Sequence, residues 1–234
     1  MKKIALNHEG TTFNIIHREY DEYHGITAAI ITMNEEENIV EFINHIRPLV
    51  SRIVVVDGGS SDKTVELAGP LVDALKIVPF NGHFGEQKNN ALKMCYTDWV
   101  LFLDPDERLD EKLYDKIKDL IEQDEYDCYS FPRREFRDNV EDESVYPDFQ
   151  RRLFRAYCRF IRPVHEELVG YKEQKTLEEG QGLDILHRKP EERHEIRNKA
   201  YPYFEAHYIN ECGEPGEQFR ETARKINIAG EQDD

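Results

Sequence analysis

The sequence predicts an α/β protein built on a mostly parallel sheet, and three observations support this fold class. Continuous apolar runs, typical of strands buried on both faces, occur at residues 26–32, 52–57 and 99–103. Candidate strand ends recur near residues 32, 57, 78 and 103, as successive βα units with short loops would place them. Amphipathic stretches with helical spacing separate the runs. We therefore expect one domain spanning residues 1–234.

The first half should alternate between strands and helices. Residues 1–24 precede this pattern and are expected to form a leading hairpin or an extension. Asn34 is expected to cap the first helix, which ends near Pro48. The later elements are a strand at 52–57, a short helix from about 63, a strand at 74–78, a helix at 85–95, a strand at 99–103 and a helix from about 110.

The alternation ends after about Tyr126. Residues 129–136 and 149–160 are expected to be strands of an antiparallel or mixed extension, with a short strand at 183–187. A polar helix is expected at about 191–210. The fold is thus a parallel α/β half followed by a mixed α+β half.

Composition excludes several functional classes. The formal charge of −17 argues against a nucleic-acid partner and against unaided docking on an anionic membrane. No apolar run approaches the roughly 20 residues that cross a bilayer, and the first residues do not resemble a secretory signal. The cysteines lack paired spacing, so we expect free thiols in a reducing cytosol. They are Cys95, Cys128, Cys158 and Cys212.

Two carboxylates directly follow the strand at 99–103. Asp104 and Asp106 stand where ligands bind in open α/β sheets, outside the carboxyl ends of the strands. One of them can hold a divalent metal on a nucleotide diphosphate while the other accepts a ribose hydroxyl. The alternative is a strand-to-helix turn that caps the helix from Asp110, and the motif alone leaves both open.

A third carboxylate, Asp57, ends the strand at 52–57. It can accept the imide N–H of a uracil or thymine ring, and Gly58 permits close approach of a ligand to the backbone. An ordinary turn remains the alternative. Thr32, Asn34 and Glu35 end the first strand and should flank the same crevice.

Two further segments offer candidate site residues. Lys88 and Asn89 lie in the first turns of the third helix, where a phosphate is favoured. The run His165-Glu166-Glu167 offers a general base for an acceptor hydroxyl, or is a solvated acidic turn.

His187 could be a neutral metal ligand, or it could be structural. One basic cluster could contact a diphosphate or an anionic acceptor, or it could protect an outward-facing strand edge. It comprises Arg151, Arg152, Arg155, Arg159 and Arg162.

Together these segments resemble an inverting glycosyltransferase of family 2 with the GT-A fold, a Rossmann-like sheet flanked by helices. The motifs in the first half are ITMNEEENI at 31–39, VDGGSSDKT at 56–64, GEQKN at 85–89 and LDPDERL at 103–109. The second half adds FQRRLFR at 149–155, VHE at 164–166 and ILH at 185–187, followed by Lys199 and Tyr201. This finer pattern is similar to the short soluble subgroup that contains lipopolysaccharide core β-glucosyltransferases.

The resemblance implies a role for each candidate. Asp57 would recognise the nucleobase and Asp104 would bind the ribose. Asp106 would hold Mn²⁺ or Mg²⁺, with His187 completing the metal shell. Glu166 would be the general base that deprotonates the acceptor hydroxyl. Residues 25–110 would bind the nucleotide sugar and residues 111–234 the acceptor. The chain departs from the family pattern at Asp57-Gly58, where two Asp are usual, and at the pair Glu166-Glu167, which leaves the identity of the base open.

The expected reaction is transfer of one sugar from a UDP- or dTDP-sugar to a glycan or glycolipid acceptor. The Gln-x-x-Arg-Trp motif of processive synthases is missing, which favours a single addition. The expected location is the cytoplasm, with contact at the inner face of the membrane left open, as is the oligomeric state. The alternatives are a nucleotidyltransferase that makes nucleotide sugars, which would carry a Gly-rich loop after the first strand, and a non-catalytic nucleotide-sugar-binding domain.

Overall fold

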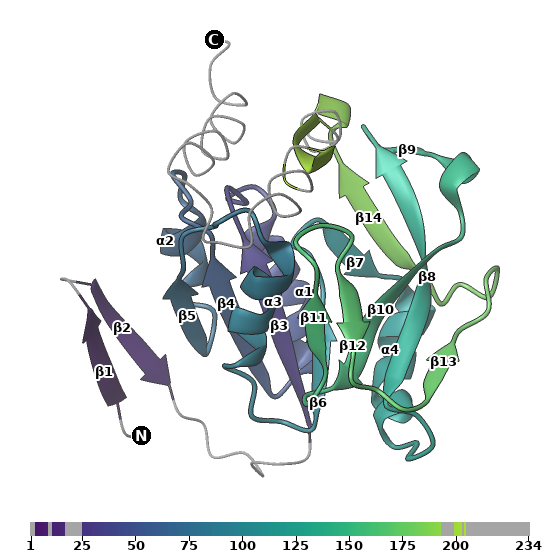
Figure 1. Ribbon diagram of the computed structural model, residues 1–234, viewed down its shortest axis with the longest axis horizontal. Helices are drawn as coiled ribbons and strands as arrows, with labels where there is room; N and C mark the ends of the chain where they lie inside the picture. Colours follow the sequence, from purple (N-terminus) through teal and green to yellow (C-terminus); the bar gives the residue numbers. More distant parts are fainter. Residues whose placement is uncertain (1–2, 9–10, 17–24, 193–198, 203, 205–234) are drawn as a thin grey trace.

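A computed structural model describes residues 3–8, 11–16, 25–192, 199–202 and 204 (Figure 1). Residues 1–24 were expected to form a hairpin or an extension, and their described part is a hairpin. In it, β1 (Lys3–His8) pairs antiparallel with β2 (Thr11–Ile16). The predicted helix at 191–210 lies mostly outside the described residues.

A single large sheet organises the rest of the described chain, with its main strands in the order β5-β4-β3-β6-β10-β8-β14-β7. Its first four strands are parallel, as predicted, because each is followed by a helical crossover that returns the chain to the same end of the sheet. These strands are β3 (Ile26–Thr32), β4 (Arg52–Asp57), β5 (Ala74–Ile77) and β6 (Trp99–Phe102).

Helices and a small hairpin cover the two faces of this sheet (Figure 1). The apolar stripes of α1 (Ile39–Ile46) and α4 (Glu111–Ile121) join one core cluster with strands β3 and β4. On the other face, α3 (Phe84–Leu92) packs with the hairpin of β11 (Arg159–Ile161) and β12 (Glu167–Val169). The short elements are α2 (Thr64–Ala68) and the 3-10 turns Arg47–Leu49 and Glu143–Val145.

The second half extends the sheet beyond β6. Strand β10 (Asp148–Arg155) runs antiparallel between β6 and β8 (Cys128–Arg137). Because of this direction, the beginning of β10 lies at the edge where β3, β4 and β6 end. The remaining strands are β7 (Glu107–Leu109), β9 (Val140–Glu141), β13 (Gln174–Thr176) and β14 (Ile185–Lys189).

Two local predictions were wrong. The first helix begins at Ile39 with Asn38 at its N-cap, rather than after Asn34. Asn34 has a positive φ of 55°, which lies outside the helical range, and its side chain instead accepts a hydrogen bond from the backbone of Ser61. The segment after Asp106 also holds an unpredicted strand, β7, because it pairs with β14 from far along the chain.

Candidate functional site

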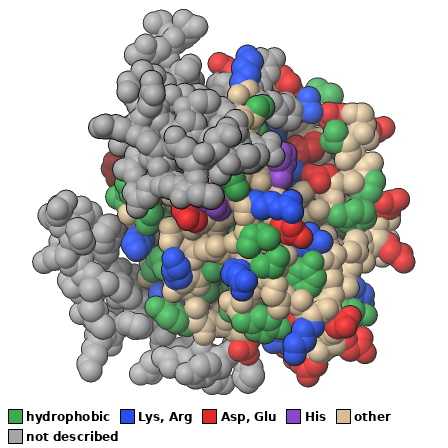
Figure 2. All heavy atoms as spheres, in the orientation of Figure 1, with side chains coloured by type: hydrophobic (Ala, Val, Ile, Leu, Met, Phe, Trp, Pro, Cys, Tyr) green, Lys and Arg blue, Asp and Glu red, His purple; other side chains and the backbone are tan. Residues whose placement is uncertain are grey.

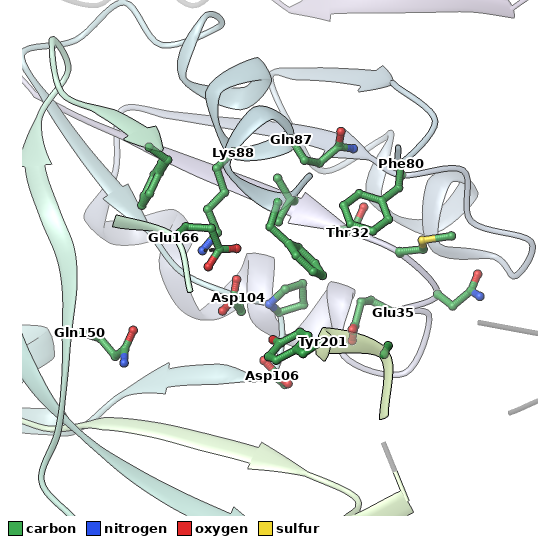
Figure 3. A pocket seen from close by; sticks show the side chains of 18 of the residues that line it. Thr32, Glu35, Phe80, Gln87, Lys88, Asp104, Asp106, Gln150, Glu166 and Tyr201 are labelled. Carbon is green, nitrogen blue, oxygen red and sulfur yellow. Dashed lines mark ion pairs between the residues drawn. The ribbon is translucent and has the colours of Figure 1, made fainter. Parts of the chain in front are cut away.

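A cleft of about 1020 Å³ opens at the carboxyl ends of the parallel strands (Figure 3). Most of the predicted site residues line it: Thr32, Asn34, Glu35, Gly58, Lys88, Asp104, Asp106, His165 and Glu166. Asp57, Asn89, Glu167 and His187 do not line it. The sheet edge has therefore brought together residues that are up to 134 positions apart in the sequence.

An aromatic wall of the cleft was not predicted. Phe80 and Phe84 contact each other with ring centroids 4.6 Å apart, and Phe84 also contacts Tyr201. Tyr201 in turn lies against the ring of His165. The family resemblance included Tyr201 among its motif residues, and the tertiary structure places this side chain in the cleft.

Asp57 is fully buried beneath the loop that follows β4. One carboxylate oxygen accepts the backbone N–H groups of Gly59 and Ser60, and the other accepts the hydroxyls of Thr32 and Ser60. These four bonds occupy the acceptor positions of a carboxylate. In this structure Asp57 therefore holds the turn that follows β4. To accept the N–H of a nucleobase, its carboxylate would have to lose the hydrogen bond from the hydroxyl of Thr32 or Ser60. The assignment of Asp57 to nucleobase recognition stays a prediction.

The loop after β3 is tied to the loop after β4. The backbone N–H of Asn34 donates to Ser60 Oγ at 2.9 Å, and that of Glu35 donates to Thr64 Oγ1 at 2.7 Å. Because these bonds join the two strand ends, the rim of the cleft at Asn34 and Glu35 is held by side chains of the VDGGSSDKT segment.

Lys88 projects into the cleft from α3, next to the rings of Phe102 and Phe160. Its Nζ lies 3.5 Å from Glu166 Oε1, and Figure 3 shows the two side chains pointing toward each other. Asn89 instead exchanges two hydrogen bonds with the backbone of Phe160. Asn89 therefore holds β11 against α3, while Lys88 faces the ligand space.

The structure distinguishes the two candidate bases. Glu166 lines the cleft, and its side chain is largely buried. Glu167 begins β12, is exposed, and forms an ion pair with exposed Arg162 at 3.2 Å. Successive residues of an extended segment point in opposite directions, so the cleft receives only the first of the pair.

A buried ion-pair network lies beneath the two aspartates. One terminal nitrogen of Arg152, Nη2, donates to Asp104 Oδ2 at 2.9 Å and to Glu107 Oε1 at 2.6 Å. Glu107 is fully buried, and its other oxygen accepts the backbone N–H of Asp104. Burial favours the neutral form of Arg152, but the charges of Glu107 and Asp104 outweigh it and raise the pKa of this guanidinium. Asp104 is therefore held at its carboxylate by Arg152 and at its backbone N–H by Glu107.

The same network reaches Asp106 through a second chain of contacts. Arg133 pairs with Glu107, Glu135 and Asp148. Glu135 Oε1 lies 2.8 Å from His187 Nδ1, and His187 Nε2 lies 3.0 Å from Asp106 Oδ2. Burial alone would raise the pKa of Glu135, but the hydrogen bond and charge of His187 lower it to about 2.

His187 is 1% exposed. Burial lowers the pKa of its imidazole, but the charge of Asp106 and the bonds to Asp106 and Glu135 outweigh burial and raise it.

Asp106 lines the cleft and His187 lies beside it, so these two side chains are the candidates to hold a divalent cation. A histidine that places one ring nitrogen at a carboxylate and the other toward the metal is a frequent arrangement in metal sites, and Glu135 supplies that carboxylate. No group of three or more such side chains in the described part of the chain forms a complete metal cage. A cation that a nucleotide diphosphate also coordinates needs few protein ligands, because phosphates and waters supply the rest.

The arginine cluster divides between different environments. Arg151 and Arg152 line the cleft, Arg155 packs over Trp99, and Arg159 and Arg162 are exposed. The cleft thus receives two members of the cluster, and both interpretations offered by the sequence stay predictions. Arg133, Glu107 and Glu135 were missed as site residues, because nothing in their local sequence signals that strands β7 and β8, with β14 between them, bring them together. Cys95, Cys128 and Cys158 are free thiols, and Cys212 lies outside the described residues.

Comparison with known proteins identifies the family of this chain. The model for "Glycosyl transferase family 2" matches residues 27–187. The chain belongs to glycosyl transferase family 2. The match contains the strand-end aspartates, Glu166 and His187.

Curated relatives agree with this membership. An uncharacterized glycosyltransferase of Rickettsia felis is 33% identical over 158 residues, which are 63% of this chain and 56% of that protein. The lipopolysaccharide core biosynthesis glycosyltransferase LpsC of Rhizobium meliloti is 35% identical over 101 residues, 41% of this chain and 37% of LpsC. The chain thus matches about half or less of the length of these relatives.

A solved structure confirms the fold. TarS 1–349 of S. aureus, crystallised with UDP-GlcNAc, superposes with a TM-score of 0.53 at 16% identity, over 70% of this chain and 58% of that one. The predicted GT-A fold with its mostly parallel sheet is therefore confirmed. Among the described helices, none is long and apolar enough to span a membrane.

We predict that Arg152→Met destabilises the protein by about 3–5 kcal/mol, because it leaves the buried Glu107 carboxylate with one cationic partner fewer. Glu107→Gln in the same chain should recover part of this loss, since it removes the uncompensated charge. Urea denaturation measures both effects. The control is Arg159→Met on the exposed face of β11, which should change stability by less than about 0.5 kcal/mol. A double variant as unstable as the sum of the single ones would contradict the coupling.

Proposed function

We propose that this chain transfers one sugar from a UDP- or dTDP-sugar to a hydroxyl of a glycan or glycolipid, with inversion at the anomeric carbon. The observation that carries the proposal is the placement of Glu166 in the same cleft as Asp104 and Asp106, within a family 2 domain. Such a cleft offers a place for the donor at the strand ends and a base for the acceptor opposite them.

The two aspartates supply the donor half of the site. Arg152 holds Asp104 at the cleft, where the exposed part of its carboxylate suits a ribose hydroxyl. Asp106 and His187 would hold Mn²⁺ or Mg²⁺, which would neutralise the diphosphate as a leaving group. Thr32, Asn34, Glu35 and Gly58 line the neighbouring end of the cleft, which we assign to the nucleoside.

Glu166 supplies the chemistry of transfer. Its carboxylate would take the proton of the acceptor hydroxyl while that oxygen bonds to the anomeric carbon and the bond from this carbon to the phosphate oxygen breaks. Lys88 lies 3.5 Å from the same carboxylate, so its ammonium group and Glu166 face the same part of the cleft. The leaving nucleoside diphosphate carries away the bonding electron pair.

The class of acceptor and the cellular location are also part of the proposal. Similarity to LpsC supports a glycolipid acceptor of the lipopolysaccharide core type. We place the reaction in the cytoplasm, with contact at the inner face of the membrane left open. On the face shown in Figure 2, lysine and arginine side chains are interspersed with acidic ones.

Donor binding should require a divalent cation and should fail in Asp106→Ala, because the diphosphate charge then lacks its counter-ion. Isothermal titration of UDP with and without Mn²⁺ measures this requirement. Asp115→Ala, an exposed aspartate of α4, serves as the matched control and should bind as the wild type does. Undiminished UDP affinity in the presence of excess chelator would contradict the metal assignment.

If Asp57 reads a pyrimidine imide, the wild type should prefer UDP over CDP, because cytosine lacks the N–H at that ring position. Asp57→Asn should weaken UDP binding by about 1.5–3 kcal/mol, the range of a hydrogen bond to a charged group, and should reduce the preference over CDP. Competition binding with the two nucleotides measures it. If the variant weakens both nucleotides equally, the role of Asp57 is confined to holding the turn.

Glu166→Gln should lower turnover by about 10²–10⁴-fold while leaving donor affinity nearly unchanged, because the base contacts the acceptor rather than the donor. Initial rates of transfer and a separate UDP titration distinguish the two effects. Glu167→Gln is the matched comparison, since that neighbour points away from the cleft. Loss of turnover in Glu167→Gln alone would move the role by one residue, and wild-type rates in both variants would place the base elsewhere.

A further inference from the structure

One cation of the cleft has no acidic partner. The lysine and arginine side chains that line it in the described part of the chain are Lys88, Arg133, Arg151 and Arg152. Three of these form ion pairs with carboxylates. Arg151 forms none with any described residue, although the whole chain has 48 acidic residues against 31 basic ones. Its charge is therefore available to a ligand.

Two contacts orient the guanidinium of Arg151. Its Nε donates to Gln174 Oε1 at 2.7 Å, and its Cζ lies 5.6 Å from the ring centroid of Tyr171. Neither terminal nitrogen donates to a described residue. An arginine held in this way presents a rigid pair of N–H donors, which matches the two oxygens of a carboxylate or a phosphate.

Arg151 lies away from the nucleoside end of the cleft. It is near the start of β10, next in the chain to Gln150. Figure 3 shows Gln150 at the opposite end of the view from Thr32 and Phe80. Tyr171, which contacts Arg151, packs against the apolar cluster that includes Phe102 and Phe160. Lys88, the partner of Glu166, lies over the rings of the same two phenylalanines. Arg151 and the proposed base are therefore on the same face of the sheet.

We propose that Arg151 binds an anionic group, a carboxylate or a phosphate, on the acceptor. This inference rests on the proposed function, since it names the class of acceptor that the same cleft selects. A neutral glycan would gain little from an oriented guanidinium. An anion would otherwise be repelled by the carboxylates that line the cleft, among them Asp104 and Glu166. Arg151 offsets this repulsion, so its removal should make an anionic ligand bind less well than a neutral one.

The test uses three matched probes: methyl β-glucoside, methyl β-glucuronide and the 6-phosphate of methyl β-glucoside. Their dissociation constants are measured by NMR titration of the full chain saturated with UDP and Mg²⁺. The wild type should bind the better of the two anionic probes at least about tenfold more tightly than the neutral one, the effect of a charged hydrogen bond. Which of the two anions binds more tightly identifies the group.

Arg151→Gln should remove this preference or reverse it, while UDP affinity stays at the wild-type level. Arg159→Gln, an exposed arginine outside the cleft, should keep the preference. Equal affinity of the wild type for all three probes, or an unchanged preference in Arg151→Gln, would overturn the inference. Failure of the wild type to bind UDP would instead count against the proposed function, so the two failures are distinguishable.

Discussion

The buried carboxylate of Glu107 is the group on which the floor of the cleft depends. It accepts hydrogen bonds from Arg152, from Arg133 and from the backbone of Asp104. A charge in such a position is tolerated only because it is fully paired, since burial of an unpaired ion costs several kcal/mol. The pairing in turn fixes the strands that carry its partners. The position of Asp104 is therefore set by ion pairs whose shared carboxylate, Glu107, is fully buried beneath the ligand space.

The sheet topology explains how this network can form. Strand β10 enters antiparallel beside β6, so its first residues meet the ends of the parallel strands. Strand β14 lies between β8 and β7, with His187 in register with both Glu135 and Glu107. The mixed half of the chain thus does more than cover the parallel half. It provides the cations that hold the aspartates of the DPD motif and the histidine beside Asp106.

The cleft has two ends of different chemistry. The end near Thr32 and Gly58 is formed by loops that bond to each other through Asn34, Ser60 and Ser61. The other end is formed by β10 and the segment around Glu166, where the terminal nitrogens of Arg151 donate to none of the described residues. This division agrees with a donor that enters at the strand ends and an acceptor that approaches across the antiparallel extension.

Local sequence was sufficient to predict the buried parallel strands and the edge of the sheet at which the cleft lies. The apolar runs at 26–32, 52–57 and 99–103 predicted buried parallel strands, and the strand-end residues predicted where the cleft would be. Those predictions succeeded because burial on both faces and the direction of parallel strands leave one edge for ligands. The tertiary structure alone decided that Glu166 faces the cleft while Glu167 does not, and that Arg152 is buried while Arg151 is available. Such outcomes depend on strand register and on partners more than 20 residues away, and no local pattern encodes them.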